Sequence, residues 1–150
     1  MANNYLEFSE VLELTDEQMD WAKVRMAEIE AGEEKLIDDG EETLLGFGYE
    51  FEDGGIWLYG EEYGNVENVA GFAYEIFNHF DIEGSFRIEW ACHCSKPRLS
   101  EFYGGAVIVT KDRVIYINAS EIAHKIEKAI IDGVLTSKAV EFTNCGVPIV

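Results

Sequence analysis

Apolar positions at helical spacing predict three helices. After Thr15, apolar residues recur every three or four positions, at Met19, Trp21 or Ala22, Met26 and Ile29, which predicts a helix over 16–31. The segment Thr15-Asp-Glu-Gln18 has the pattern of a capping box at its start. Asn65 precedes a second helix, from about Val66 to Phe80, and Asn118 opens a third, which ends near Ile131. We expect the third helix to turn its isoleucines inward, namely Ile122, Ile126 and Ile130.

Alternation of apolar and polar residues predicts about five strands. Residues 1–14 alternate weakly with acids and are expected to form a short edge strand or an extended lead-in. Residues 44–62 are typical of two strands joined by a turn at Asp53-Gly54-Gly55. Residues 86–94 predict a strand, and 104–110 with 113–118 predict a hairpin around Lys111-Asp112. The last twenty residues favour one more strand with a loose tail.

The order of these elements predicts an α+β fold in one domain over 1–150. Short turns favour an antiparallel meander of about five strands, with two or three helices packed on one face. Within it we distinguish an N-terminal helix with an acidic linker (1–43), a body of strands and two helices (44–131) and a C-terminal tail (132–150).

Charge changes this picture most. The chain of 150 residues carries a net charge of −19, and residues 1–62 hold 19 acids against 3 bases. A field of that sign opposes nucleic acid and anionic membranes, and it favours a basic protein surface. Solubility alone is the competing explanation. If the acids bind a partner, we expect the binding face to be Asp38, Asp39, Glu41, Glu42, Glu50, Glu52, Asp53, Glu61 and Glu62.

The lengths of the apolar segments and the number of cysteines indicate the cellular compartment. No stretch approaches the roughly 18 apolar residues of a membrane span, and no signal segment is evident, so we expect a cytoplasmic protein. The chain has 3 cysteines, for which free thiols are the simpler interpretation. Long hairpins with exposed aromatics are compatible with a homodimer.

The segment CHCSKPRLSEFYGG, residues 92–105, suggests metal or thiol chemistry at first sight. Strand alternation, however, places Cys92 and Cys94 on the apolar face with Trp90, and His93 on the opposite face. Zinc sites use four ligands, usually in pairs spaced by two to four residues, so the pattern predicts no metal. A thiol nucleophile would need a histidine such as His79 or His124 nearby. No other catalytic motif appears, and neither an enzyme nor a cofactor is indicated.

The same segment also has the residue types of an anion cradle. Arginine binds phosphate bidentately, and glycines let backbone N–H groups approach a ligand. The alternative is a purely structural turn in which Arg98 pairs with Glu101 and the glycines admit a bulge. The residues of this loop are Arg87, His93, Ser95, Lys96, Arg98, Glu101, Phe102, Gly104 and Gly105.

The stretch WACHCSKPRLSEFYGGAVIVT resembles the signature of a family of small phage and bacterial proteins with no assigned activity. In this signature a tryptophan strand precedes CSKPR, EF and a glycine run; the segments NYLEFSEVLELT and IWLYGEEYGNVENVA also resemble that family. One departure is Tyr103, where the family tends to have glycine, which suggests a less open loop. The resemblance implies no catalytic residue, but it does imply a phage or mobile-element setting.

Three hypotheses follow. The first is a non-enzymatic acidic protein that inhibits a basic, nucleic-acid-binding host defence protein as a DNA mimic, by analogy with other phage counter-defence proteins. The second is a binder of a nucleotide or phosphorylated metabolite at the CSKPR–EF–GG loop. The third is a thiol- or metal-dependent enzyme that uses Cys92, Cys94 or His93.

Overall fold

The computed structural model describes residues 3–38, 45–133, 141–142 and 148–149, with residues 34–38 described by their backbone alone. The chain divides into two compact units, Met1–Ile117 and Asn118–Val150. Each unit is described by itself. The single domain expected over 1–150 stays a prediction.

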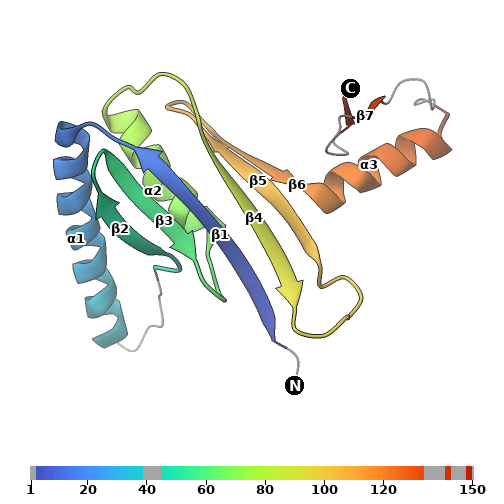
Figure 1. Cartoon of the computed structure of the whole chain (residues 1–150), viewed down its shortest axis with the longest axis horizontal. Helices are drawn as coiled ribbons and strands as arrows, with labels where there is room; N and C mark the ends of the chain where they lie inside the picture. The colour runs from blue at the N-terminus through green and yellow to red at the C-terminus, as the bar shows by residue number, and fades with distance from the viewer. Residues whose placement is uncertain (1–2, 39–44, 134–140, 143–147, 150) are drawn as a thin grey trace. The chain divides into compact units, whose positions relative to one another are not determined.

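The first unit contains a six-stranded antiparallel sheet (Figure 1). Its strand order is β2-β3-β1-β4-β5-β6. The α+β class is therefore confirmed, with six strands rather than about five. The strands are β1 (Asn4–Glu13), β2 (Gly48–Glu52), β3 (Gly55–Gly60), β4 (Phe86–Cys94), β5 (Tyr103–Val109) and β6 (Val114–Asn118).

Strand β1 corrects the predicted edge strand. It is an interior strand that pairs with β3 through Phe8–Glu13 and with β4 through Asn4–Phe8. The sheet is therefore not a meander, because the first strand is inserted between the third and the fourth. The acids of β1 are compatible with this position because one face of an antiparallel sheet can be solvated. Phe8 and Leu12 point into the core, while Glu7 and Glu13 are exposed.

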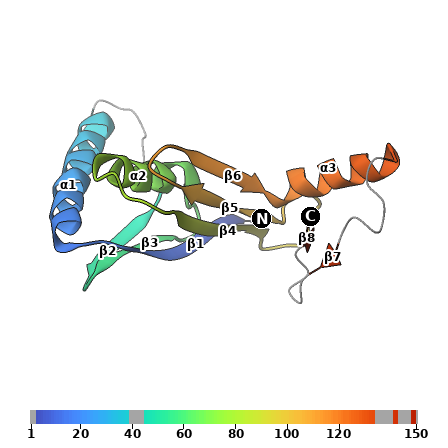
Figure 2. The same ribbon diagram turned by 90° about the horizontal axis from the view of Figure 1, so that it is seen from above.

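Helices α1 (Asp16–Asp38) and α2 (Val66–His79) lie on the same side of this sheet (Figure 2). The capping box of α1 is confirmed: the Thr15 N–H donates to Gln18 Oε1 at 3.0 Å, and the Gln18 N–H donates to Thr15 Oγ1 at 3.3 Å. Asn65 caps α2, since its Oδ1 accepts from the Asn68 N–H at 3.0 Å. Helix α1 runs two turns beyond the predicted end at residue 31, into a segment expected to be a linker. Its glutamates, lysine and leucine are good helix formers.

The core fills the layer between the helices and the sheet. Met26 of α1 and Ile76 of α2 are almost fully buried, as are the strand residues Leu58, Ile88 and Val107. At about 25 cal/mol per Å² of apolar surface, this layer supplies the main stabilisation of the unit. The opposite face of the sheet carries polar residues of β1 such as Glu7 and Ser9, but also apolar side chains such as Val11 and Trp57.

The second unit contains α3 (Ala119–Ile131) and a two-stranded antiparallel sheet of β7 (Glu141–Phe142) and β8 (Pro148–Ile149). Asn118 caps α3 as predicted, accepting from the Ser120 and Glu121 N–H groups. The inward isoleucines are a wrong prediction: Ile122 and Ile130 are 41% and 56% exposed, and no residue of α3 is buried. Periodicity identifies which face of a helix is apolar, but not whether anything covers that face. Cys145 lies outside the described residues.

Of the helices in the described ranges, none combines the length and the apolar character that a membrane crossing requires.

Candidate functional site

Strand β4 separates the three residues of the apparent metal triplet. Cys94 is buried and Cys92 is half-buried on the core face, as predicted. His93 lies on the other face, where it stacks on Tyr5 at 4.9 Å and its Nε2 is 3.3 Å from Glu7 Oε2. Within the described part of the chain, no three His, Cys, Asp or Glu residues are grouped to hold a metal ion.

The histidines that a thiol nucleophile would need, His79 and His124, have other surroundings in the structure. The thiol of Cys92 lies beside the phenol of Tyr103, and this interaction raises the pKa of Tyr103 above its usual value. His79 stacks on Trp21 at 4.6 Å, between α1 and α2. His124 is exposed on α3, in the second unit. The described contacts thus pair Cys92 with a phenol and not with a base.

The glycine pair of the loop has a packing role in β5. A Cβ on Gly105 would lie 2.0 Å from the carbonyl oxygen of Ile117 and 2.9 Å from the ring of Trp90. A Cβ on Gly104 would lie 2.8 Å from the carbonyl oxygen of Trp90. Neighbouring backbone and the Trp90 indole therefore occupy the space that any larger residue would need.

Two further members of the predicted loop also have partners within the protein. The Ser95 N–H donates to the Asn3 carbonyl at 2.8 Å, and Ser95 Oγ accepts from the Asn3 N–H at 2.9 Å. Arg87 is 3.4 Å from Glu89 on the open face of the sheet. The Ser95 contacts join the loop to Asn3, the residue that precedes β1.

The remaining loop residues are Lys96, Arg98, Glu101 and Phe102. Lys96 and Arg98 are exposed, and neither forms an ion pair within the described residues. The expected Arg98–Glu101 pair is therefore not formed. Glu101 Oε2 is buried with no hydrogen-bond partner in the described structure, and Phe102 is exposed.

An aromatic hollow of about 320 Å³ lies beside this loop. Trp90 and Tyr103 line it, with ring centroids 5.9 Å apart and planes at 82°. Tyr116 completes the aromatic lining, and burial, together with the nearby charge of Glu67, raises its pKa. The lining of this hollow is mostly apolar.

The acidic face is only partly within the described residues. Asp39, Glu41 and Glu42 lie outside them, and Asp38 is described only as the last residue of α1. The others are exposed, and none forms an ion pair in the described structure: Glu50 and Glu52 on β2, Asp53 in the hairpin turn, and Glu61 and Glu62 after β3.

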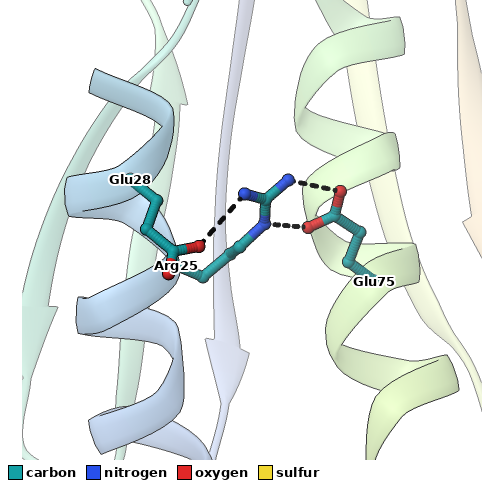
Figure 3. Close-up of polar contacts among 3 residues, drawn as sticks. All are labelled: Arg25, Glu28 and Glu75. Carbon is teal, nitrogen blue, oxygen red and sulfur yellow. Dashed lines mark hydrogen bonds and ion pairs between the residues drawn. The ribbon is translucent and has the colours of Figure 1, made fainter. Parts of the chain in front are cut away.

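The basic residues of α1 have partners elsewhere. Lys23 lies over the ring of Phe51, 5.5 Å from its centroid. Arg25 bridges the two helices (Figure 3): its Nε and Nη2 donate to the carboxylate of Glu75 at 2.7 and 3.1 Å, and its Nη1 donates to Glu28 at 3.3 Å. The bidentate contact with Glu75 raises the pKa of Arg25. Neither base forms an ion pair with the exposed acids of β2 or with Glu61 and Glu62 in the described structure.

Sequence reasoning missed a groove of about 500 Å³ between α1 and α2. Ile29, Phe47 and Phe72 give it an apolar lining, and Gly32 and Gly71 face it from the two helices. The available signal was Gly71, an unexplained glycine in the middle of a strongly periodic helix. Gly32 was assigned to a linker, which concealed its position in α1.

Comparison with known proteins gives no family for this chain: no protein-family model, curated protein or solved structure matches it.

Proposed function

We propose that the protein is a non-enzymatic, acidic interaction protein that binds a basic surface of a nucleic-acid-binding protein and inhibits it. The observation that carries this proposal is the lack of ion-pair partners for Glu50, Glu52, Asp53, Glu61 and Glu62 in the described structure, although all five are exposed. Unpaired surface carboxylates keep their field available to an incoming basic partner.

The arrangement of these acids supports an extended contact. Glu50, Glu52 and Asp53 follow the edge strand β2 to the hairpin turn, whereas Glu61 and Glu62 follow the opposite end of β3. A strand of six residues spans about 20 Å at 3.3 Å per residue. The charges are therefore spread along the hairpin, as is needed to cover a surface that normally holds a nucleic-acid backbone.

The biological setting of the proposal is counter-defence. The resemblance of residues 90–110 to small phage and bacterial proteins favours a phage or mobile-element origin. In that setting the partner would be a host defence protein, and the acidic face would occupy its nucleic-acid channel as a DNA mimic.

Capture from a bacterial lysate at low ionic strength tests this proposal. The expected result is recovery of a basic, nucleic-acid-binding protein whose association weakens as salt is added. The test variant changes Glu50, Glu52, Glu61 and Glu62 to glutamine. A matched control removes the same number of charges elsewhere, through Asp112→Asn, Glu121→Gln, Glu127→Gln and Asp132→Asn.

The control must bind as the unmodified protein does, and the test variant must lose most of its partner. Equal loss of the partner by both variants would show that binding depends on the net charge of the protein and not on this acidic face. Recovery of no basic partner at low salt would remove the proposal.

A second candidate function is the binding of a nucleotide or phosphorylated metabolite near the CSKPR loop. Lys96 and Arg98 favour it, because both cations are exposed without an ion pair in the described residues. A thermal-shift screen against nucleotides tests it, with Arg98→Ala as the control. A shift that persists in Arg98→Ala would exclude this site.

A further inference from the structure

The groove between α1 and α2 begins where two filled layers end. The helices run antiparallel, because Trp21 stacks on His79 and, one turn on, Arg25 binds Glu75. Bulky or long side chains fill the space between the helices at both levels. Further along the two helices, Gly71, one turn from Glu75, and Gly32, about two turns from Arg25, line the groove instead.

Packing among the described residues does not explain these two glycines. A Cβ built on Gly32 or on Gly71 meets no atom within 4 Å, and neither residue has the positive φ that favours glycine. Glycine is the least favourable residue in a helix interior after proline. Both glycines face the same groove, so what they provide is open space at the groove.

The charges around the groove favour a cation. Arg25 is the one base among the described lining residues, and its guanidinium is already bound by Glu75 and Glu28. Glu33 and Glu67 line the groove from opposite helices, and neither forms an ion pair in the described residues. A cationic group entering here would meet two unpaired carboxylates above an apolar floor.

The floor is suited to a flat cation on an apolar stem. Phe47 and Phe72 lie with ring centroids 6.1 Å apart, and Ile29 packs beside the core. A guanidinium stacks on aromatic rings and pairs with carboxylates in its own plane, whereas an ammonium is a strongly hydrated point charge.

We propose that this groove receives an arginine side chain from the partner protein, with the guanidinium between Glu33 and Glu67 and its stem against Phe47 and Phe72. This inference rests on the proposed function and names the anchor point of that interaction. The acids of β2, of the hairpin turn and of the residues after β3 then steer the approach of the basic surface, and the groove fixes its position.

A pair of short peptides tests the groove without the partner. The probes are acetyl-Gly-Leu-Arg-Leu-Gly-amide and the same peptide with citrulline, which keeps the shape of arginine but has no charge. Binding to the full chain is followed by amide chemical shifts in NMR. We expect saturable shifts centred on Gly32 and Gly71, and affinity at least about tenfold lower for the citrulline peptide.

Variants then locate the site. Gly71→Leu fills the groove, and Ala27→Leu, which adds the same side chain at an exposed α1 position outside the groove lining, is the matched control. Glu33→Gln combined with Glu67→Gln removes the charge without filling the space. We expect Gly71→Leu and the double variant each to weaken binding of the arginine peptide by about tenfold or more, and Ala27→Leu to leave it unchanged. Thermal unfolding checks that each variant is folded.

Each outcome decides between the two proposals. Equal binding of both peptides, no binding, or binding unaffected by the groove variants would overturn the arginine site. If the lysate capture still recovers a basic partner in that case, the proposed function stands without this anchor. If the arginine peptide binds the groove but no basic partner is captured, the site stands and the proposed function falls.

Discussion

At the scale of single residues, Tyr49 ties β2 to α1 through its phenol. The O–H donates to Glu30 Oε1 at 2.5 Å, and this bond, with burial, raises the pKa of Tyr49 from 10.0 to about 12. A raised pKa in the folded state means that the neutral phenol stabilises the fold. That stabilisation is complete below pH 10 and is lost as the pH rises towards about 12.

Replacing Tyr49 with phenylalanine removes this contribution. We expect Tyr49→Phe to lower the free energy of unfolding near neutral pH by about 1 kcal/mol, the typical net value of a hydrogen bond. The difference from the unmodified protein should shrink between pH 10 and about 12. Urea unfolding across this range measures it, with Tyr63→Phe, at a residue 72% exposed, as the control. A difference that is constant with pH would contradict the assignment.

Gly105 is a second residue whose role is steric. Alanine would place its Cβ 2.0 Å from the Ile117 carbonyl oxygen, and that oxygen belongs to backbone that cannot rotate away. We expect Gly105→Ala to reduce the free energy of unfolding by about 2 kcal/mol or more, as in other overpacked sites.

The matched variant is Gly32→Ala, because its Cβ meets nothing within 4 Å. Helix propensity predicts a gain of about 0.8 kcal/mol there. Equilibrium unfolding of the two variants is therefore expected to shift in opposite directions. Equal shifts would show that β5 does not approach its neighbours as described.

At the scale of elements, local signals predicted most of the fold. Thr15 and Gln18, Asn65 and Asn118 marked helix starts correctly because capping depends on residues adjacent in sequence. Local sequence patterns also predicted the β2–β3 hairpin, and they predicted that His93 lies on the opposite face of β4 from the two cysteines. The alternation of β4 also predicted correctly that Cys92 and Cys94 face the core.

Properties that depend on distant partners could not be predicted in this way. The position of β1 depends on its pairing with β3 and β4, which lie at least 40 residues further along the chain. The groove depends on which faces of α1 and α2 meet, and no spacing in the sequence indicates that Arg25 reaches Glu75. Five of the acids proposed for the partner surface are exposed, but their role in binding stays a prediction.

The interior position of β1 has a direct test. Glu7 pairs with Ala91 of β4, one residue before the pairing of β1 with β3 begins, and proline at this position would lack the N–H and disturb the pairing. We expect Glu7→Pro to destabilise the fold by about 3 kcal/mol or more, the scale of proline inside regular structure. An edge strand would tolerate it better.

Glu7→Thr is the control for side-chain effects. It keeps the strand but removes the contact with His93, which is partly exposed and should contribute less than about 1 kcal/mol. Unfolding monitored by circular dichroism separates the two variants. Similar stability of both would argue against an interior β1.

At the scale of the whole molecule, the acidic segment of the sequence does not coincide with the folded unit. The acids concentrate in residues 1–62, but the core of the first unit uses residues from Phe8 to Val109. The described acids of this segment are thus part of the folded unit. They lie on β1, α1 and β2 and in the segments that flank β3, which gives this part of the proposed partner surface a defined shape.

The same division predicts that the first unit folds without the second. In the described structure no buried residue of the core lies beyond Val109, and α3 buries none of its own side chains. We expect a fragment of residues 1–117 to unfold cooperatively, with a midpoint within about 5 °C of the full chain, since a loss of roughly 1 kcal/mol shifts a domain of this size by that much. Scanning calorimetry of the fragment and the full chain measures this. A fragment without a cooperative transition would show that residues 118–150 complete the fold, and it would support one domain over 1–150. A transition that matches that of the full chain would make the first unit a domain in its own right. The described part of the acidic surface and the groove would then both lie inside that domain.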